Sequence, residues 1–144
     1  EHLFRARRDG VPVGLLYLDL NGFKPVNDTY GHAAGDTVLM EVSRRLERAV
    51  RPEDTVARLG GDEFAILVPG AESEADLDML ADVLHAELSE PILLAGGEEV
   101  SIGTAVGVAL GTAETTADEL LRAADEAMYR AKEASRVDRV AAVR

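Results

Sequence analysis

Residues 11–20 are almost continuously apolar and form the first strongly patterned stretch of the chain. A run without polar alternation is typical of a strand that is buried on both faces of a sheet. A single carboxylate, Asp19, stands near its end, which is unusual for a buried strand. Residues 2–8 are expected to be the last turns of a helix that ends at Gly10, where glycine supplies a left-handed residue.

Three later segments carry apolar residues on one face at the 3.6-residue helical period. They span residues 37–50, 73–90 and 116–134. Asp36 is the expected N-cap of the first helix, and Pro91 ends the second. Thr116 and Glu119 form a capping box at the start of the third. A short helical piece is expected near Pro25, because proline is tolerated in a first helical turn.

Paired glycines between strand-like runs mark two hairpins. The arms are residues 55–59 and 64–68 around Gly60-Gly61, then residues 92–94 and 100–110 around Gly96-Gly97. The order strand, helix, strand, strand, helix, strand is that of a split β-α-β unit. We predict an α+β domain of the ferredoxin-like or palm type: a mixed antiparallel sheet flanked by helices, with an extra hairpin and a C-terminal helix. The 144 residues suit one such domain, expected to cover residues 1–144.

The predicted topology brings acidic side chains together at one edge of the sheet. The first and third strands of a split β-α-β unit are antiparallel neighbours, so Asp19 is expected beside Asp62. Two carboxylates about 4 Å apart repel by about 4 kcal/mol at an effective dielectric of 20, and a divalent cation reverses this. Hard oxygen ligands suit magnesium or manganese. Glu63 is expected on the opposite face, available to handle a proton, although an acidic pair at a hairpin tip is also a common solvated feature.

The charge distribution argues against a nucleic-acid surface. The net charge is -12, and no lysine or arginine lies between Leu59 and Leu121. Nucleic-acid binders need a basic footprint, whereas a small anion needs only a local basic cluster. The sequence contains no cysteine, no apolar run of membrane-spanning length and no signal peptide pattern. We therefore expect a cytoplasmic domain that does not contact the membrane.

Several motifs together resemble one known family. The chain contains the signature of the GGDEF domain, Gly60-Gly61-Asp62-Glu63-Phe64, and a run similar to its second signature, Asp19-Leu20-Asn21-Gly22-Phe23-Lys24 followed by Asn27-Asp28, Gly31-His32 and Gly35-Asp36. Residues 124–132 resemble the C-terminal helix of that family. Over nearly its whole length the chain thus resembles the catalytic domain of diguanylate cyclases, which condense two GTP into cyclic di-GMP and two pyrophosphates.

The resemblance implies a metal-dependent catalytic centre. Asp19 and Asp62 would bind Mg²⁺ or Mn²⁺, with the Leu20 carbonyl assisting. Glu63 would act near the 3′-hydroxyl, as a further metal ligand or as the base.

The resemblance also implies a site for the GTP phosphates. Backbone N–H groups of the turn would bind them, together with two basic side chains of the last helix. These residues are Asn21, Gly22, Phe23, Lys24, Lys132 and Arg136. The i, i+4 spacing of Lys132 and Arg136 places them on one helix face, although basic residues near a helix C-terminus also simply complement its dipole.

Guanine recognition and feedback are implied at two further places. Asn27 and Asp36 would read the guanine edge, because a carboxylate accepts from guanine N1–H and N2–H₂. Arg51 and Asp54 resemble the family's Arg-x-x-Asp inhibitory site for cyclic di-GMP. The alternative for this pair is a plain helix-to-strand turn. In that family, inhibition commonly also needs an arginine from the helix after the hairpin. No arginine lies between Leu59 and Leu121, so we expect inhibition by cyclic di-GMP to be weak.

The wider context follows from the same resemblance. Catalysis would need a homodimer, because one domain presents only one such edge. The family's upstream Asp-x-Leu-Thr segment is missing, so we expect an N-terminally truncated domain, fused to a sensory domain in a longer protein. Two alternatives remain: a catalytically silent domain that senses GTP or cyclic di-GMP, and a pure dimerisation module. The intact acidic residues favour the cyclase.

Overall fold

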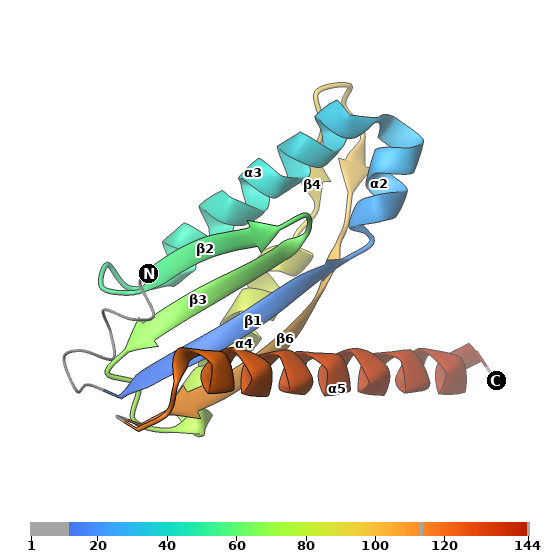
Figure 1. The fold of residues 1–144 in the computed structure, drawn as a ribbon. Helices are drawn as coiled ribbons and strands as arrows, with labels where there is room; N and C mark the ends of the chain where they lie inside the picture. Colours follow the sequence, from blue (N-terminus) through green and yellow to red (C-terminus); the bar gives the residue numbers. More distant parts are fainter. Residues whose placement is uncertain (1–11, 113, 144) are drawn as a thin grey trace.

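The computed structural model describes residues 12–112 and 114–143, and the side chains of residues 12–112 and 114–134. Within these ranges the chain forms a four-stranded sheet in the order β2-β3-β1-β6 (Figure 1). The strands are β1 (Val13–Asn21), β2 (Thr55–Gly60), β3 (Glu63–Pro69) and β6 (Gly103–Gly111). All neighbouring pairs in this sheet are antiparallel. The predicted α+β class and the side-by-side placement of the first and third strands are confirmed.

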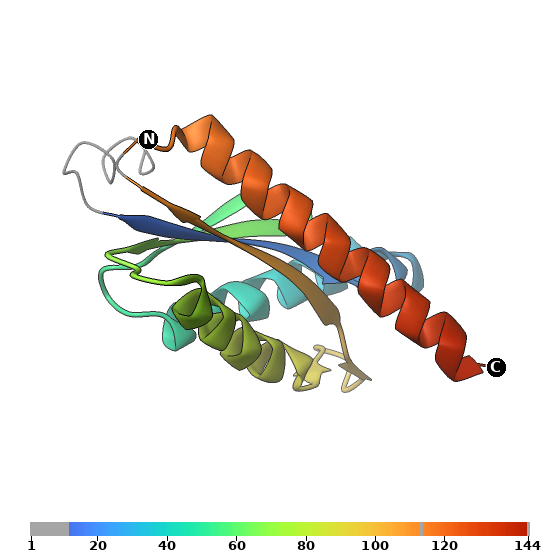
Figure 2. The same cartoon turned by 90° about the horizontal axis from the view of Figure 1, so that it is seen from below.

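Helices cover both faces of the sheet. On one face lie α3 (His32–Ala49) and α4 (Glu74–Ser89), and α5 (Ala117–Val143) crosses the other face (Figure 2). The shorter helix α2 (Phe23–Tyr30) packs against α3. This layering explains the apolar run in β1, because Leu16 and Leu18 face the α3 and α4 side while Leu15 faces α5. All three leucines are fully buried.

The position of α5 above the sheet is set at two points. A Cβ atom on Gly107 would lie 2.1 Å from the backbone nitrogen of Met128 and 2.2 Å from the carbonyl oxygen of Ala124. Only glycine allows the helix to come so close. At its start, Thr116 N–H donates to Glu119 Oε1 at 2.9 Å, and Glu119 N–H donates to Thr116 Oγ1 at 3.1 Å. The predicted capping box is confirmed.

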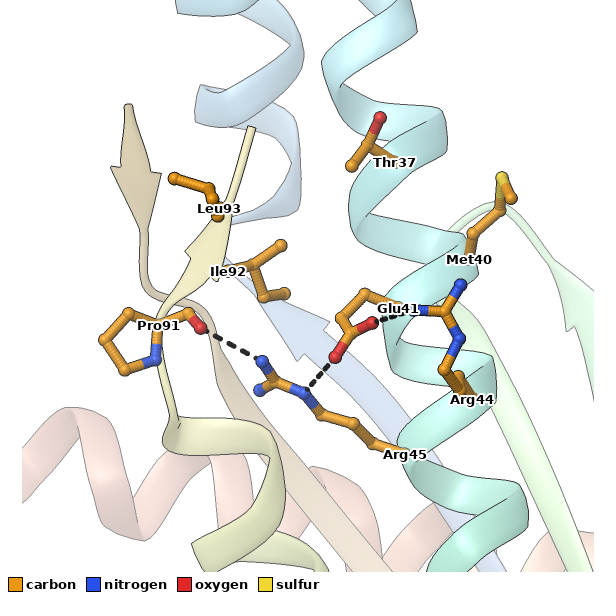
Figure 3. Close-up of a pocket in the computed structure, with 8 residues that line it drawn as sticks. All are labelled: Thr37, Met40, Glu41, Arg44, Arg45, Pro91, Ile92 and Leu93. Atoms are coloured by element: carbon orange, nitrogen blue, oxygen red, sulfur yellow. Dashed lines mark hydrogen bonds and ion pairs between the residues drawn. The ribbon is translucent and has the colours of Figure 1, made fainter. Parts of the chain in front are cut away.

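A buried arginine of α3 holds the end of α4 (Figure 3). The Arg45 guanidinium donates to the carbonyl oxygens of Glu87, Glu90 and Pro91 at 3.0, 2.7 and 3.0 Å, and to the Glu41 carboxylate at 2.8 Å. The bond to Glu87 satisfies a carbonyl group that the last turn of α4 leaves without an intrahelical partner, and the bonds to Glu90 and Pro91 fix the segment that follows the helix. The cavity of about 390 Å³ beside Arg45 lies between α3 and the segment after α4. We assign this cluster a structural role.

The predicted start of the helix at residue 37 was wrong. α3 begins at His32, directly after Gly31, whose φ of 92° separates it from α2. Asp36 therefore lies inside α3 and is not its N-cap. Sequence periodicity missed the first turn because its residues are exposed or only partly buried until Gly35.

The second hairpin is also smaller than predicted. β4 (Ile92–Leu93) and β5 (Glu99–Val100) form a separate two-stranded sheet, and a short non-strand segment connects β5 to β6. The expected single strand 100–110 divides because Val100 pairs with Ile92, whereas Gly103 onwards pairs with β1. α5 continues past the expected end at residue 134 to Val143. The predicted helix at residues 2–8 lies outside the described residues.

Among the described residues, no helix combines the length and apolar character needed to cross a membrane.

Candidate active site

The acidic segments meet where β1 ends and the β2–β3 hairpin turns (Figure 1). In the register of β1 with β3, Asp19 stands opposite Glu63. The backbone N–H of Leu20 donates to the carbonyl oxygen of Asp62 at 3.0 Å and joins the two segments. Gly61 forms the tip with a φ of 50°. The structure thus brings Asp19, Asp62 and Glu63 to the same edge of the sheet.

Asp62 and Glu63 have different surroundings, although they are adjacent in sequence. Asp62 lies in the turn, whereas Glu63 begins β3 with its side chain on the α5 face of the sheet. Glu63 Oε2 accepts a hydrogen bond from the Tyr17 hydroxyl. This bond, together with burial and the nearby carboxylates of Glu63, Asp125 and Asp19, raises the pKa of Tyr17. The hydroxyl therefore stays protonated, and remains a donor, at neutral pH.

Asp19 is paired with a lysine that lies far along the chain. Lys132 reaches from α5 and donates through Nζ to Asp19 Oδ2. The Asp19 side chain is 14% exposed and that of Lys132 is 41% exposed. The hydrogen bond to Asp19 raises the pKa of Lys132, and the charges of Asp19, Asp62 and Glu63 add to this effect. The site therefore holds a positive charge directly against its acidic centre.

The carboxyl group of Asp62 is under electrostatic strain. Burial raises its pKa, and the negative charges of Asp19 and Glu63 raise it further. A divalent cation would relieve this repulsion, and carboxylate oxygens are the donors that Mg²⁺ and Mn²⁺ prefer. Among the described side chains, no three acidic or histidine groups are arranged as a complete metal site. Asp19 and Asp62 fit the usual magnesium pattern of one or two carboxylates completed by water and substrate phosphates.

The predicted phosphate turn lies at the start of α2. Gly22 is the N-cap residue with a φ of 89°, and Phe23 and Lys24 are the first residues of the helix. Their N–H groups belong to the first helical turn, which has no intrahelical partners and attracts anions. Asn21 and Gly22 also border a cavity of about 750 Å³ that extends to the start of β6 and to α5. Sequence reasoning did not anticipate this cavity.

The two predicted guanine-reading residues come from neighbouring helices. Asn27 lies in α2 and Asp36 in α3. Asn27 is pressed against Gly35, because a Cβ atom there would lie 1.8 Å from Asn27 Oδ1. Gly35 directly precedes Asp36 in α3, so this contact between α2 and α3 lies one residue away from Asp36 in the sequence. The sequence feature that permits this contact is the glycine at the fourth residue of α3.

Arg51 and Asp54 lie in the turn between α3 and β2. The Arg51 N–H donates to Asp54 Oδ2 at 2.9 Å, and the Arg51 guanidinium is 3.6 Å from Asp54 Oδ1. Asp54 Oδ1 is buried without a hydrogen-bond partner among the described atoms. The Arg51 side chain is 58% exposed, and the pair borders a cavity of about 400 Å³. The side chain of Arg136, predicted to bind phosphate, lies outside the described residues.

The comparison with protein families identifies the chain. The model of the family "Diguanylate cyclase, GGDEF domain" matches residues 1–138. The chain is 44% identical to the bifunctional diguanylate cyclase/cyclic di-GMP phosphodiesterase MucR of Pseudomonas aeruginosa over 133 residues, which cover 92% of this chain and 19% of MucR. It is also 44% identical to the diguanylate cyclase TpbB of Pseudomonas aeruginosa over 143 residues, which cover 95% of this chain and 33% of TpbB. The chain therefore spans a third or less of these relatives.

Solved structures show the same fold. The GGDEF domain of YfiN or TpbB from Pseudomonas aeruginosa superposes with a TM-score of 0.85 at 42% identity, covering 92% of this chain and 85% of that one. The GGDEF domain of DgcB from Caulobacter crescentus, in complex with c-di-GMP, gives a TM-score of 0.84 at 28% identity, covering 92% of this chain and 81% of that one. A palm-like sheet with an acidic edge defines a class of nucleotidyl-transferring domains. Within that class, the chain belongs to the diguanylate cyclase GGDEF family.

Proposed function

We propose that this domain is a diguanylate cyclase that condenses two GTP into cyclic di-GMP and two pyrophosphates. The observation that carries the proposal is the convergence of acidic residues at one edge of the sheet: Asp19 at the end of β1 stands opposite Glu63, and the Leu20 N–H donates to the carbonyl oxygen of Asp62 in the signature hairpin. Lys132 lies against the same centre, as a phosphate-binding group must. Each of two symmetrical steps forms a bond between a 3′-oxygen and an α-phosphorus and breaks the bond to the β-phosphate, so that pyrophosphate leaves.

The acidic residues divide the chemistry between them. Asp19 and Asp62, with the Leu20 carbonyl, would hold Mg²⁺ or Mn²⁺, which when bound supplies charge neutralisation and lowers the pKa of a ligated hydroxyl. Glu63 lies beside them on the α5 face and would act either as the base that takes the proton of the 3′-hydroxyl or as a further metal ligand. Its other carboxylate oxygen, Oε1, is the atom that we assign to this role, because Oε2 accepts from Tyr17.

The remaining site residues bind and orient GTP. The β- and γ-phosphates lie at the start of α2, held by N–H groups of residues 21–24 and by Lys132 and Arg136. Lys132, which contacts Asp19, would then exchange this partner for phosphate oxygens, since Asp19 would be one of the residues that hold the metal. Asn27 and Asp36 pair with the guanine edge, and adenine lacks the two adjacent donors that a carboxylate recognises.

We further propose that Arg51 and Asp54 bind the product. Asp54 Oδ1 is a buried acceptor without a hydrogen bond, and guanine N1–H and N2–H₂ are donors that could pair with it. The exposed guanidinium group of Arg51 can stack on a second guanine or bind a phosphate. Arg51→Ala is expected to weaken inhibition by added cyclic di-GMP several-fold while leaving the initial rate nearly unchanged. If the variant is inhibited as strongly as the parent, Arg51 and Asp54 do not bind the product and serve only as a turn between α3 and β2.

The decisive experiment is incubation of the chain with GTP and Mg²⁺, with products identified by mass spectrometry. Cyclic di-GMP and pyrophosphate are expected from the parent, and Glu63→Gln should lose this product while still binding GTP. ATP in competition should be a far poorer substrate if Asp36 reads the base. A parent that binds GTP or cyclic di-GMP without turnover would instead support a silent nucleotide-sensing domain.

A further inference from the structure

Tyr17 lies on the α5 face of β1 and contacts Glu63, the glutamate of the signature, which lies on the neighbouring strand β3. In the sheet register it stands opposite Ala65 on β3 and Gly107 on β6. Glu63 is the diagonal neighbour two positions from Ala65, and side chains as long as tyrosine reach across such diagonals. Its ring is partly buried and packs against the apolar cluster under α5.

The surroundings direct the ring of Tyr17 toward Glu63. On the β6 side, the backbone of α5 passes directly over Gly107, at the positions of Met128 and Ala124. On the β3 side, the small side chain of Ala65 leaves room for the ring. The phenol oxygen then donates to Glu63 Oε2. The strand register and the close approach of α5 to the sheet at Gly107 therefore determine this contact.

We propose that Tyr17 is a positioning residue for Glu63 in the cyclase reaction, a role that rests on the proposed function. A glutamate at a hairpin exit has three rotatable side-chain bonds, and a free one would sample several positions. The Tyr17 hydroxyl binds one carboxylate oxygen and leaves Oε1 for the 3′-hydroxyl or the metal. A reacting group must be held within a fraction of an ångström to retain the full rate. Asp19 follows two residues later on the same face, so one strand positions both acidic groups.

Tyr17→Phe tests this role because it removes only the hydroxyl and keeps the ring that packs under α5. We expect kcat for cyclic di-GMP formation at saturating Mg²⁺ to fall about tenfold, with the KM for GTP unchanged within about twofold. Tyr129→Phe is the matched control, because Tyr129 is a tyrosine of α5 that is 61% exposed. Its kinetic constants should equal those of the parent. A raised KM with unchanged kcat for Tyr17→Phe would overturn the positioning role.

A spectroscopic measurement tests the contact without turnover. The chain has three tyrosines and no tryptophan, so Tyr30→Phe with Tyr129→Phe leaves Tyr17 as the only fluorescent side chain of these types. A phenol bound to a carboxylate loses its proton to it in the excited state, and its emission is quenched. Adding Glu63→Gln should therefore raise the emission of Tyr17. Equal emission with and without Glu63→Gln would overturn the contact.

The outcomes separate this proposal from the proposed function. A parent that forms no cyclic di-GMP overturns the proposed function and the positioning role together. An active parent with an equally active Tyr17→Phe variant overturns the positioning role alone.

Discussion

At the residue scale, the surroundings of Asp62, a predicted metal ligand, oppose the stability of the folded chain. Its carboxyl group is partly buried beside Asp19 and Glu63, and these surroundings disfavour its ionised form. The folded chain without metal therefore holds a negative charge that the unfolded chain accommodates more easily.

Asp62→Asn is expected to raise the melting temperature at neutral pH in the absence of metal. The pKa of Asp62 is higher in the folded chain than its ordinary value of 3.8, so the ionised group destabilises the fold at every pH above the folded pKa. Below the ordinary value both states hold the proton, and the gain from the substitution disappears. Thermal unfolding with a chelator at pH 7 and near pH 3 measures both limits. A lower melting temperature than the parent at pH 7 would contradict the assigned strain.

At the scale of elements, the junction between α3 and α4 depends on Arg45. This side chain is 8% exposed and donates to the carbonyl oxygens of Glu87, Glu90 and Pro91. Figure 3 shows its bonds to Pro91 and to the Glu41 carboxylate. The neighbouring Arg44 also pairs with Glu41, at 2.7 Å, but its side chain is 62% exposed. The two arginines form a natural comparison between a buried and an exposed ion pair.

Arg45→Met should lower the free energy of unfolding by about 3 kcal/mol, because it leaves a partly buried carboxylate and several carbonyl groups without their donor. Arg44→Met should change it by less than about 1 kcal/mol. Denaturant unfolding of both variants measures the difference, and equal losses would refute the assigned role. The hydrogen bond from Arg45 lowers the pKa of Glu41, so this stabilisation is present above the ordinary pKa of 4.5 and is lost as the pH falls through the folded pKa.

At the scale of the whole molecule, the acidic residues lie at one end of the sheet, where β1 ends and the β2–β3 hairpin turns (Figure 1). Cyclic di-GMP contains two nucleotides joined by two equivalent bonds, and in the proposed reaction a single edge with one set of Asp19, Asp62 and Glu63 would hold one of them. The proposed reaction therefore requires two copies of the domain with these edges facing each other. Each copy has a net charge of -12, so their repulsion makes this encounter weak unless nucleotide and metal reduce it.

Product formation is therefore expected to rise more steeply than linearly with protein concentration, close to its square where most of the chain is monomeric. Initial rates at saturating GTP over a hundredfold range of protein concentration test this expectation. A strictly linear dependence down to nanomolar protein would show that one copy suffices.

The sequence by itself determined the order of elements, the buried first strand and the pairing of Asp19 with the signature hairpin. These features follow from local information: unbroken hydrophobicity, glycine turns and a capping box, combined with the few topologies that the element order allows. The hydroxyl and carboxyl groups of Thr116 and Glu119 formed the expected cap because all its atoms lie within one turn.

Only the tertiary structure decided which distant side chains meet. Lys132 pairs with Asp19 across 113 positions because α5 packs closely on the sheet at Gly107. Hydrophobic periodicity encodes neither the distance of a helix from the sheet nor the direction in which it crosses the sheet. Tyr17 finds Glu63 through the strand register. The start of α3 was misjudged because hydrophobic periodicity reports which face of a helix is buried, not where a helix with exposed first residues begins. Local patterns specify elements, whereas packing between elements specifies the site.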